Sequence, residues 1–515
     1  MFELLPGELS IKDICFLLDS STKIKLKDTA YQAIEKSYAI VQRVIAQDKS
    51  VYGINTGFGL LADKKIAKED LKALQRKIVL SHASGVGAPL DNETVKLILL
   101  LKINSLSRGY SGVSKQLINH LIAIYNAGVL PFIPEQGSVG ASGDLAPLAH
   151  MAMTLIGEGD AYFNSKKMPA TDALKAANLA PIVLGEKEGL ALLNGTQVST
   201  AIAIIGLLKT QRNFAIASIA GALSLDAASG SIKPFQSIIA KTKNNQGQIL
   251  FSALIERLLQ GSQILTDHQH CPRVQDPYSL RCQPQVMGAI WTYLNDSQTH
   301  LMNEANGVSD NPLVCIETGN IISGGNFHAE VTAISADLIA IIGAEIGAIS
   351  ERRISLLIDK TLSGLPAFLV ENSGLNSGFM LAHVTASSLA SENKTYAHPA
   401  SVDSLPTSAN QEDHVSMATF AAVKLNKIAD NVLYILVIET LAACQGIDFR
   451  APLKTSDALQ VYYNAVRSNV PFYKEDRYFA HDINEAYKVI NHPSYYSVLR
   501  EQLFHPIDEA LVPRQ

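Results

Sequence analysis

The apolar positions of this chain gather into several long segments, which are separated by loops rich in glycine, proline and asparagine. From Ala30 to Ile45 the apolar residues recur at helical spacing, which predicts a helix. Residues 198–228 are apolar almost all round, as is typical of a helix in the interior of a bundle. Long helices are also expected over residues 328–357 and 415–444. The pattern therefore predicts a mainly α fold with a long-helix bundle core.

The chain divides into regions of different character. Residues 1–200 combine helices with glycine-rich loops and are expected to form a loop-rich N-terminal region. Residues 201–450 hold the long apolar runs of the central bundle, and residues 451–515 have the pattern of a C-terminal cap of shorter helices. At 515 residues the chain is longer than one ordinary domain, which agrees with more than one subregion.

Composition narrows the class of protein. Hydrophobic residues make up 47% and charged residues only 18%, so we expect the chain to bury surface against other copies of itself. The net charge of −5 offers no electrostatic attraction for nucleic acid or for an anionic membrane. The five scattered cysteines give no disulfide framework and the acidic N-terminus lacks a signal-peptide pattern, so a cytoplasmic location is expected. The apolar runs at 201–225 and 335–349 contain charged residues and are expected to be buried helices, not bilayer spans.

The segment 137–143 contains three glycines and two serines, and a stiff proline-containing segment precedes it. A sharply bent backbone there would let the Gly143 amide nitrogen attack the Ala141 carbonyl carbon, because glycine has no Cβ to block the approach. Loss of one water closes a five-membered ring, and loss of a second from Ser142 leaves an exocyclic methylidene. That group is an electrophile, which no ordinary side chain supplies. On spacing alone, an ordinary turn is the commoner interpretation of such a segment.

Other residues suggest chemistry, although each also has a structural interpretation. Tyr52 lies in the glycine-rich segment 51–59, which lacks the lysine of a phosphate-binding loop. As a base, Tyr52 would need a pKa below the usual tyrosine value of about 10. Arg281 carries a guanidinium fork, which binds a carboxylate at two points. The pattern Asp267–Cys271 has no second pair of ligands at a recognised spacing, so no metal site is expected.

Residues 140–148, Gly-Ala-Ser-Gly-Asp-Leu-Ala-Pro-Leu, resemble the signature of the aromatic amino acid ammonia-lyases and aminomutases. The resemblance extends from about Val51 to about Met417. It includes further motifs at residues 51–59, 80–87, 189–196, 274–285, 304–313, 324–330 and 401–417. It implies a 4-methylidene-imidazol-5-one group that forms autocatalytically from Ala141, Ser142 and Gly143, with no external cofactor.

The resemblance also implies roles for individual side chains. Tyr52 or Tyr278 acts as the base, and the choice between the two stays open. Arg281 binds the substrate carboxylate. Glu412 and His82 are similar to residues of the histidine-specific members and hold an imidazole, because a carboxylate can accept the imidazole N–H. The remaining expected contacts are Asn194 beside the electrophile and the substrate amine, Gln275 as a polar contact, and Phe327 against the methylidene ring.

The function that this resemblance implies is the elimination of ammonia from L-histidine, which gives trans-urocanate. The enzyme is expected to be a homotetramer whose active sites are lined by more than one subunit. Two alternatives stay open. A tyrosine or phenylalanine ammonia-lyase or aminomutase would keep Ser142 but lose the reason for Glu412, and a non-catalytic helical scaffold would leave the loop uncyclised. It is also open whether the electrophile acts on the substrate amine or on the aromatic ring.

Overall fold

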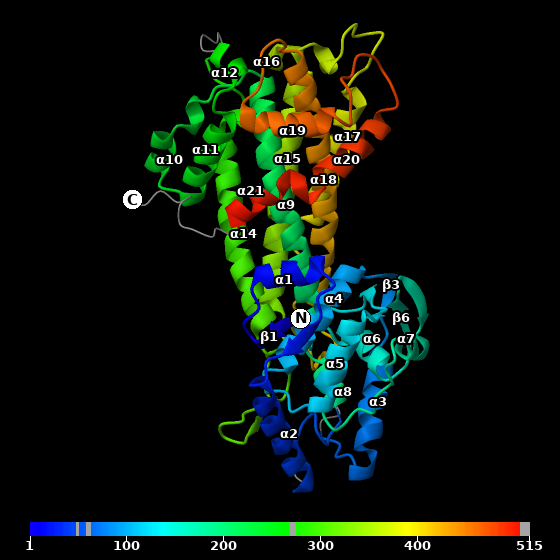
Figure 1. The fold of residues 1–515 in the computed structure, drawn as a ribbon. Coiled ribbons are helices and arrows are strands. Elements are labelled where there is room, and N and C mark those ends of the chain that lie inside the picture. The colour runs from blue at the N-terminus through cyan, green and yellow to red at the C-terminus, as the bar shows by residue number, and fades with distance from the viewer. Residues whose placement is uncertain (48–50, 58–62, 268–273, 505–515) are drawn as a thin grey trace. The chain divides into compact units, whose positions relative to one another are not determined.

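The computed structural model describes residues 1–47, 51–57, 63–267 and 274–504. Most of these residues lie in helices (Figure 1), so the predicted mainly α fold with long helices is confirmed. The chain divides into two compact units, each made of three separate stretches of sequence. The first unit comprises residues 1–205, 298–337 and 399–423, and the second comprises residues 206–297, 338–398 and 424–515. The three contiguous regions expected from the sequence stay a prediction.

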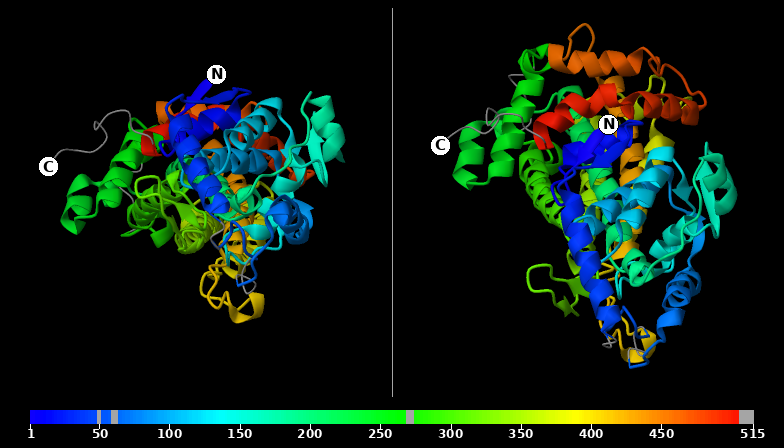
Figure 2. Two further views of the ribbon diagram at one scale, coloured as in Figure 1. Left: turned by 90° about the horizontal axis from the view of Figure 1, so that it is seen from below. Right: turned by 60° about the horizontal axis from the view of Figure 1, so that its bottom comes forward.

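Four helices of 24 to 31 residues are the longest elements (Figures 1 and 2). They are α9 (Gln197–Ala227), α14 (Gln283–Asn306), α15 (Glu330–Ile358) and α18 (Ala418–Asp448). The apolar pattern predicted α9, α15 and α18, with ends that fall within four residues of those observed. It did not predict α14, because the polar run 295–300 interrupts the apolar face of that helix.

The apolar side chains of these long helices are mostly buried inside the protein. By length and composition alone, two helices in the described part of the chain could cross a membrane, namely α15 and α18. Their most apolar windows are 67% and 83% buried inside the protein, and core helices of soluble proteins share that composition. The run 201–225, which lies in α9, is also almost entirely buried.

A buried charge network joins three of the long helices within the second unit. Arg353 of α15 and Glu439 of α18 are both fully buried, and Nη2 of Arg353 donates to Oε2 of Glu439 at 2.9 Å. Ser224 of α9 and Ser350 of α15 also donate hydroxyl hydrogen bonds to Glu439, at 2.8 and 2.5 Å. The carboxylate of α18 is thus satisfied by donors from two other helices, α9 and α15, as a buried charge requires.

Shorter helices complete both units, and side-chain caps begin several of them. Ser10 and Asp13 form a capping box at the start of α1, and Asp91 and Ser114 cap α4 and α5. The first unit holds α1 (Ile11–Asp19), α2 (Ala30–Ala46), α3 (Leu71–His82), α4 (Asn92–Leu106), α5 (Lys115–Ala127), α6 (Leu145–Leu155), α7 (Ala170–Ala176) and α8 (Glu188–Leu193). The second holds α10 (Ser237–Lys243), α11 (Gln246–Leu259), α12 (Gln263–Asp267), α13 (Tyr278–Arg281), α16 (Lys360–Ser363), α17 (Met380–Tyr396), α19 (Asp457–Arg467), α20 (Phe479–Ile490) and α21 (Pro493–Phe504).

Nine short strands lie in the first unit, among the residues that the structure describes. They are β1 (Phe2–Leu4), β2 (Ile24–Leu26), β3 (Val86–Pro89), β4 (Leu130–Pro131), β5 (Pro134–Gln136), β6 (Asp160–Phe163), β7 (Lys166–Pro169), β8 (Leu313–Val314) and β9 (Ile321–Ile322). β1 pairs in parallel with β2, whereas the sheets β3–β5, β4–β6–β7 and β8–β9 are antiparallel. The sequence did not predict these strands, because two to four residues are too few for a recognisable alternation.

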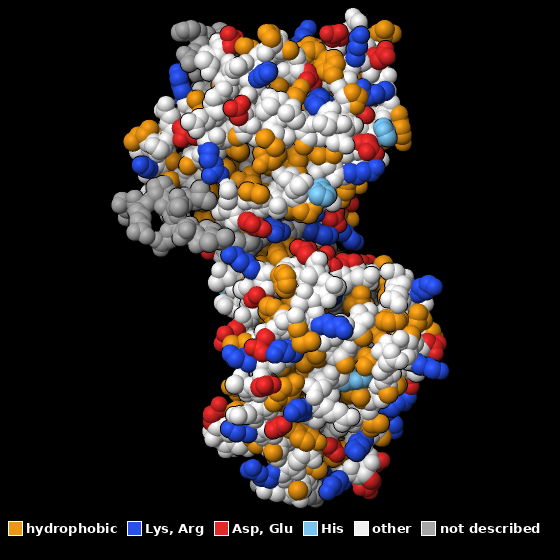
Figure 3. All heavy atoms as spheres, in the orientation of Figure 1, with side chains coloured by type: hydrophobic (Ala, Val, Ile, Leu, Met, Phe, Trp, Pro, Cys, Tyr) orange, Lys and Arg blue, Asp and Glu red, His pale blue; other side chains and the backbone are white. Residues whose placement is uncertain are grey.

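Exposed apolar side chains follow one face of α15. Val331, Ile334 and Ile341 are 48%, 55% and 46% exposed, and their spacing of three and seven residues places them on one side of the helix. On the molecular face in Figure 3, hydrophobic side chains are interspersed with charges of both signs. An apolar stripe left uncovered on a core helix is typical of a contact with another protein chain.

Candidate active site

The glycine-rich loop 137–143 connects β5 to α6. Gly140 and Gly143 have φ angles of 69° and 72°, in the left-handed region that favours glycine. A Cβ on Gly143 would lie 2.2 Å from the carbonyl oxygen of Gly195. Only glycine allows this close approach, so the local sequence builds a tight bend from Ala141 to Gly143.

Asp144 anchors the end of this loop. Its backbone N–H donates to the carbonyl oxygen of Gly195 at 2.8 Å. Its buried carboxylate accepts hydrogen bonds from the N–H of Ser199 at 2.7 Å and from the hydroxyl of Thr419 at 2.8 Å. Burial raises the pKa of Asp144, and these hydrogen bonds offset part of that rise.

A buried lysine fixes the segment that Gly143 approaches. Nζ of Lys102 donates to the carbonyl oxygens of Ala191 and Asn194, at 3.0 and 2.9 Å. Burial lowers the pKa of Lys102 to about 7, although Asp310 and Asp144 act in the opposite direction. The sequence interpretation missed this residue, although a lysine inside the apolar run 97–106 was a visible signal.

A pocket of about 270 Å³ opens beside the loop. Its lining comes from the end of α3, from residues 137–146 and from Thr407 and Glu412. Ala141, Ser142 and Gly143 all face it. Within it, Oγ of Ser142 donates a 2.7 Å hydrogen bond to Oε1 of Glu412. The structure therefore brings the loop expected to cyclise into contact with the carboxylate expected to bind imidazole.

Glu412 is held as a carboxylate. Its second oxygen, Oε2, accepts hydrogen bonds from the hydroxyls of Thr407 at 2.8 Å and Ser408 at 2.7 Å. Burial raises the pKa of Glu412, but the three hydroxyl hydrogen bonds outweigh it and hold the pKa below the ordinary value of 4.5. Glu412 is consequently an acceptor at neutral pH, and an N–H group in the pocket can donate to it.

His82 also lines the pocket, at the C-terminal end of α3. Its Nδ1 lies 3.0 Å from the hydroxyl of Ser81. Burial lowers the pKa of His82 below 6.5, although Glu412 acts in the opposite direction. The ring is therefore neutral at pH 7 and offers one donor and one acceptor nitrogen.

Asn194 lies beside the loop and has an open acceptor. Its side chain is buried, and Nδ2 donates to the carbonyl oxygen of Asn311 at 3.3 Å. Among the described residues, no group donates a hydrogen bond to its buried Oδ1. A buried acceptor of this kind suits an incoming N–H donor, such as the ammonium group of an amino acid.

Two expected residues lie in the first unit but outside this pocket lining. Tyr52 is half-buried in the loop 51–57, and Phe327 is half-buried just before α15. Within the described residues, neither side chain contributes to the lining of the pocket at Ser142. Their proposed roles rest on the sequence resemblance.

Gln275, Tyr278 and Arg281 form a second cluster, in the second unit. Nη2 of Arg281 donates to Oε1 of Gln275 at 3.1 Å, and its guanidinium carbon lies 4.6 Å from the ring centre of Tyr278. Arg281 and Gln275 line a pocket of about 370 Å³, and Tyr278 is 70% exposed. The guanidinium is thus held on one side and available to a carboxylate on another.

Parts of two segments named in the sequence analysis lie outside the described residues. They are residues 268–271 of the histidine- and cysteine-containing segment and residues 58–59 of the glycine-rich segment.

Comparison with known proteins shows the family of the chain. Residues 9–468 match the family model described as aromatic amino acid lyase. The chain is 56% identical over 489 residues to histidine ammonia-lyase of Legionella pneumophila strain Lens, across 95% of this chain and 97% of that protein. The solved structure of histidine ammonia-lyase from Trypanosoma cruzi has a TM-score of 0.88 and 38% identity, across 99% of this chain and 96% of that one. Phenylalanine aminomutase from Pantoea agglomerans has a TM-score of 0.91 and 30% identity, across 96% and 100%.

Fold, loop and matches together define an ammonia-lyase, an enzyme that breaks a carbon–nitrogen bond. The chain belongs to the aromatic amino acid lyase family. The resemblance drawn from residues 140–148 is confirmed, as is the likeness to the histidine-specific members.

Proposed function

We propose that this protein eliminates ammonia from L-histidine and releases trans-urocanate. Relatives named histidine ammonia-lyase, which are 54% to 56% identical over nearly the whole chain, support this function. A base takes the β-proton, the electron pair of that C–H bond forms the double bond, and the amine leaves with the C–N bonding pair. The reaction is non-oxidative and needs no external redox cofactor.

The observation that most directly supports histidine as the substrate is the hydrogen bond between Ser142 and Glu412. It sets a carboxylate acceptor beside the residue expected to become electrophilic. The imidazole of histidine has an N–H that can donate to this carboxylate, whereas the ring of phenylalanine has none. The neutral His82 ring in the same pocket offers a second polar contact to the imidazole.

The remaining groups of the substrate have partners of matching chemistry. Arg281 binds the carboxylate through its guanidinium fork, with Gln275 as a further polar contact. Oδ1 of Asn194 accepts from the substrate amine. Tyr52 or Tyr278 takes the β-proton. Positioning of this kind lowers the barrier because the reacting groups are already aligned.

The geometry of the loop supports a 4-methylidene-imidazol-5-one group formed from Ala141, Ser142 and Gly143. The absent Cβ of Gly143 leaves its amide nitrogen accessible, and the tight contact with Gly195 holds the bend that ring closure needs. When formed, the group supplies the electrophilic carbon that the amino-acid side chains lack. Phe327 packs against that ring in this proposal.

We also propose that the protein is a cytoplasmic homotetramer. The exposed apolar stripe of α15 supports assembly, because it is uncovered in the single chain. In the assembly, the Arg281 cluster of one subunit would complete the Ser142 pocket of another. The few, scattered cysteines of the sequence support a reducing compartment.

The test is the ultraviolet spectrum of the purified protein after an amino acid is added. L-Histidine should give a growing absorbance from the conjugated product, and L-phenylalanine and L-tyrosine should give little. A preference for tyrosine or phenylalanine would refute the substrate. No turnover of any of the three, together with an uncyclised loop, would favour the scaffold alternative.

A further inference from the structure

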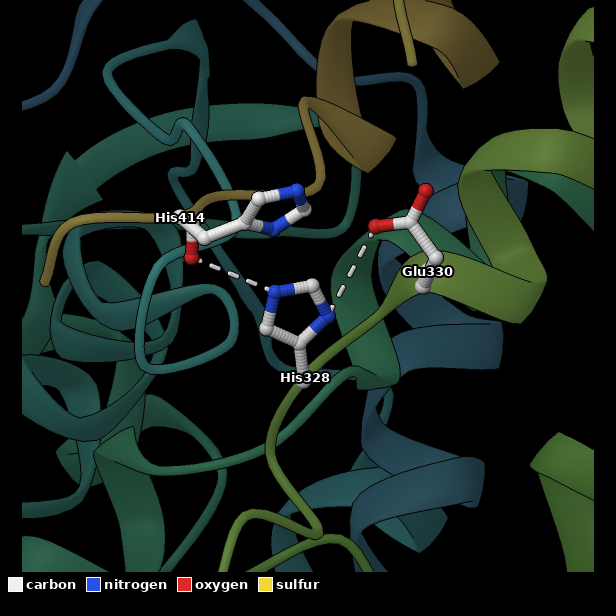
Figure 4. Close-up of side chains that lie close together, drawn as sticks. All are labelled: His328, Glu330 and His414. Atoms are coloured by element: carbon white, nitrogen blue, oxygen red, sulfur yellow. Dashed lines mark hydrogen bonds and ion pairs between the residues drawn. The ribbon is translucent and has the colours of Figure 1, made fainter. Parts of the chain in front are cut away.

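A cluster of two histidines and one glutamate lies in the first unit, apart from the pocket lining. Glu330 is the first residue of α15, His328 lies two residues before that helix, and His414 comes from the segment that leads into α18 (Figure 4). One possible ligand atom from each residue lies within 4.8 Å of the other two. His328 and Glu330 are half-buried and His414 is exposed, so an ion could reach them from solvent.

The hydrogen bond of His328 fixes which ring nitrogen can bind an ion. Nε2 of His328 lies 3.3 Å from the backbone carbonyl oxygen of His414. A carbonyl oxygen can only accept, so Nε2 carries a proton and Nδ1 is the nitrogen left to bind an ion. Histidines that bind metals typically donate their other N–H in this manner, which orients the ring.

Glu330 presents an oxygen that has no hydrogen bond. Its Oε2 is a buried atom, and no donor in the described part of the chain reaches it. It faces Nδ1 of His328 at 3.8 Å, which is too long for a charge-assisted hydrogen bond of about 2.7–2.9 Å. A buried carboxylate oxygen opposite a nitrogen lone pair is unfavourable without a cation between the two.

The distance between Nδ1 of His328 and Oε2 of Glu330 suits a shared metal ion. Zinc binds histidine nitrogen and carboxylate oxygen at about 2.0–2.2 Å, which sets two ligands of a tetrahedral site roughly 3.4 Å apart. The 3.8 Å between Nδ1 and Oε2 is close to this separation. The three ligand atoms lie within 4.8 Å of one another, and rotation of the exposed His414 side chain brings its ring nitrogen into range. Two imidazoles with one carboxylate are a donor set for zinc and similar transition metals, whereas magnesium and calcium prefer oxygen ligands alone.

We propose that His328, Glu330 and His414 bind one divalent transition-metal ion of the zinc type. Nδ1 of His328, Oε2 of Glu330 and one ring nitrogen of His414 are the ligands, and water fills the open position. The site could not be predicted from the sequence, because 84 residues separate Glu330 from His414.

The ion would hold together two segments that carry residues of the proposed active site. His414 follows Glu412 by two residues, and His328 directly follows Phe327. A bound ion therefore restrains the segments that position both side chains. The metal site itself does not depend on the proposed lyase activity, since its ligands are outside the pocket lining.

The test is metal binding by the full-length protein, purified without a histidine tag and stripped with a chelator. Isothermal titration with Zn²⁺ should give one ion per chain, and Mg²⁺ should not compete. Glu330→Gln and His414→Gln should each weaken Zn²⁺ binding by roughly tenfold or more. His300→Gln, which changes an exposed histidine of the same unit, should bind like wild type.

Co²⁺ provides a second readout that reports on the ligands directly. A Co²⁺ ion with two nitrogen ligands and one carboxylate should give visible absorption bands in wild type, and these should be lost in His414→Gln. Because His414 is exposed, this variant is the one least able to disturb folding, and circular dichroism checks that it folds. Unchanged Zn²⁺ affinity and Co²⁺ bands in both Glu330→Gln and His414→Gln would overturn the proposal, as would a wild-type chain that binds no ion.

Discussion

The substitution Glu412→Gln removes a negative charge from the pocket while keeping the size of the side chain. In the structure, Oε1 of Glu412 lies 2.7 Å from the hydroxyl of Ser142, and the pKa of Glu412 is held below 4.5. A hydrogen bond to a charged group contributes about 1.5–3 kcal/mol, and 1.36 kcal/mol corresponds to a factor of ten. If this carboxylate accepts the imidazole N–H, kcat/KM for L-histidine should fall roughly 10- to 150-fold.

The assay is the steady-state rate of urocanate formation, with kcat and KM determined separately. Before cyclisation removes the Ser142 hydroxyl, the glutamine can still accept from it through its amide oxygen, so the variant should still cyclise. Asp413→Asn is the matched control, because it removes an exposed charge from the adjacent residue and should leave the kinetics unchanged. A Glu412→Gln enzyme with the kcat/KM of wild type would refute the proposed binding of imidazole.

Three further outcomes are expected. Ser142→Ala should fold but lose almost all turnover and the near-ultraviolet absorbance of the ring. Ser84→Ala, in the same pocket, should keep both. An active Ser142→Ala enzyme would contradict the proposal that Ser142 becomes part of the electrophile. Because the folded-state pKa of Glu412 is below 4.5, its contribution to stability is complete above pH 4.5 and disappears as the pH falls through the folded-state value. As the pH is lowered, the urea concentration at the unfolding midpoint should therefore fall less steeply for Glu412→Gln than for wild type. Equal slopes for the two proteins would contradict this prediction. Glu439→Gln should lower the free energy of unfolding by about 3–5 kcal/mol, because it leaves the buried Arg353 charge without its partner. Replacing that pair together by methionine and leucine should recover most of the loss in the same urea titration, and an effect as small as a surface substitution would contradict the burial argument.

The sequence predicted the parts of the fold that depend on local pattern. The helices α9, α15 and α18 are long and apolar, so their apolar pattern could be recognised over many turns. The loop 137–143 was identified because its residues are contiguous. The histidine-specific substrate followed from the family likeness of the residues around Glu412, which the comparisons support.

Contacts between distant residues could not be predicted in this way. Lys102 reaches carbonyl oxygens 89 and 92 residues away, and nothing near it in the sequence indicates that partner. Ser142 and Glu412 are 270 residues apart, and only the fold brings them to 2.7 Å. The choice between Tyr52 and Tyr278 as the base stays a prediction, because the two tyrosines belong to different units of the chain.

The intact mass of the purified protein tests the central claim most directly. Cyclisation of Ala141-Ser142-Gly143 followed by dehydration removes two water molecules from the chain. We expect a mass lower than that of the printed sequence by two waters, and Ser142→Ala should show no loss of the second water. A wild-type mass equal to that of the sequence would contradict the self-formed electrophile and the mechanism that depends on it.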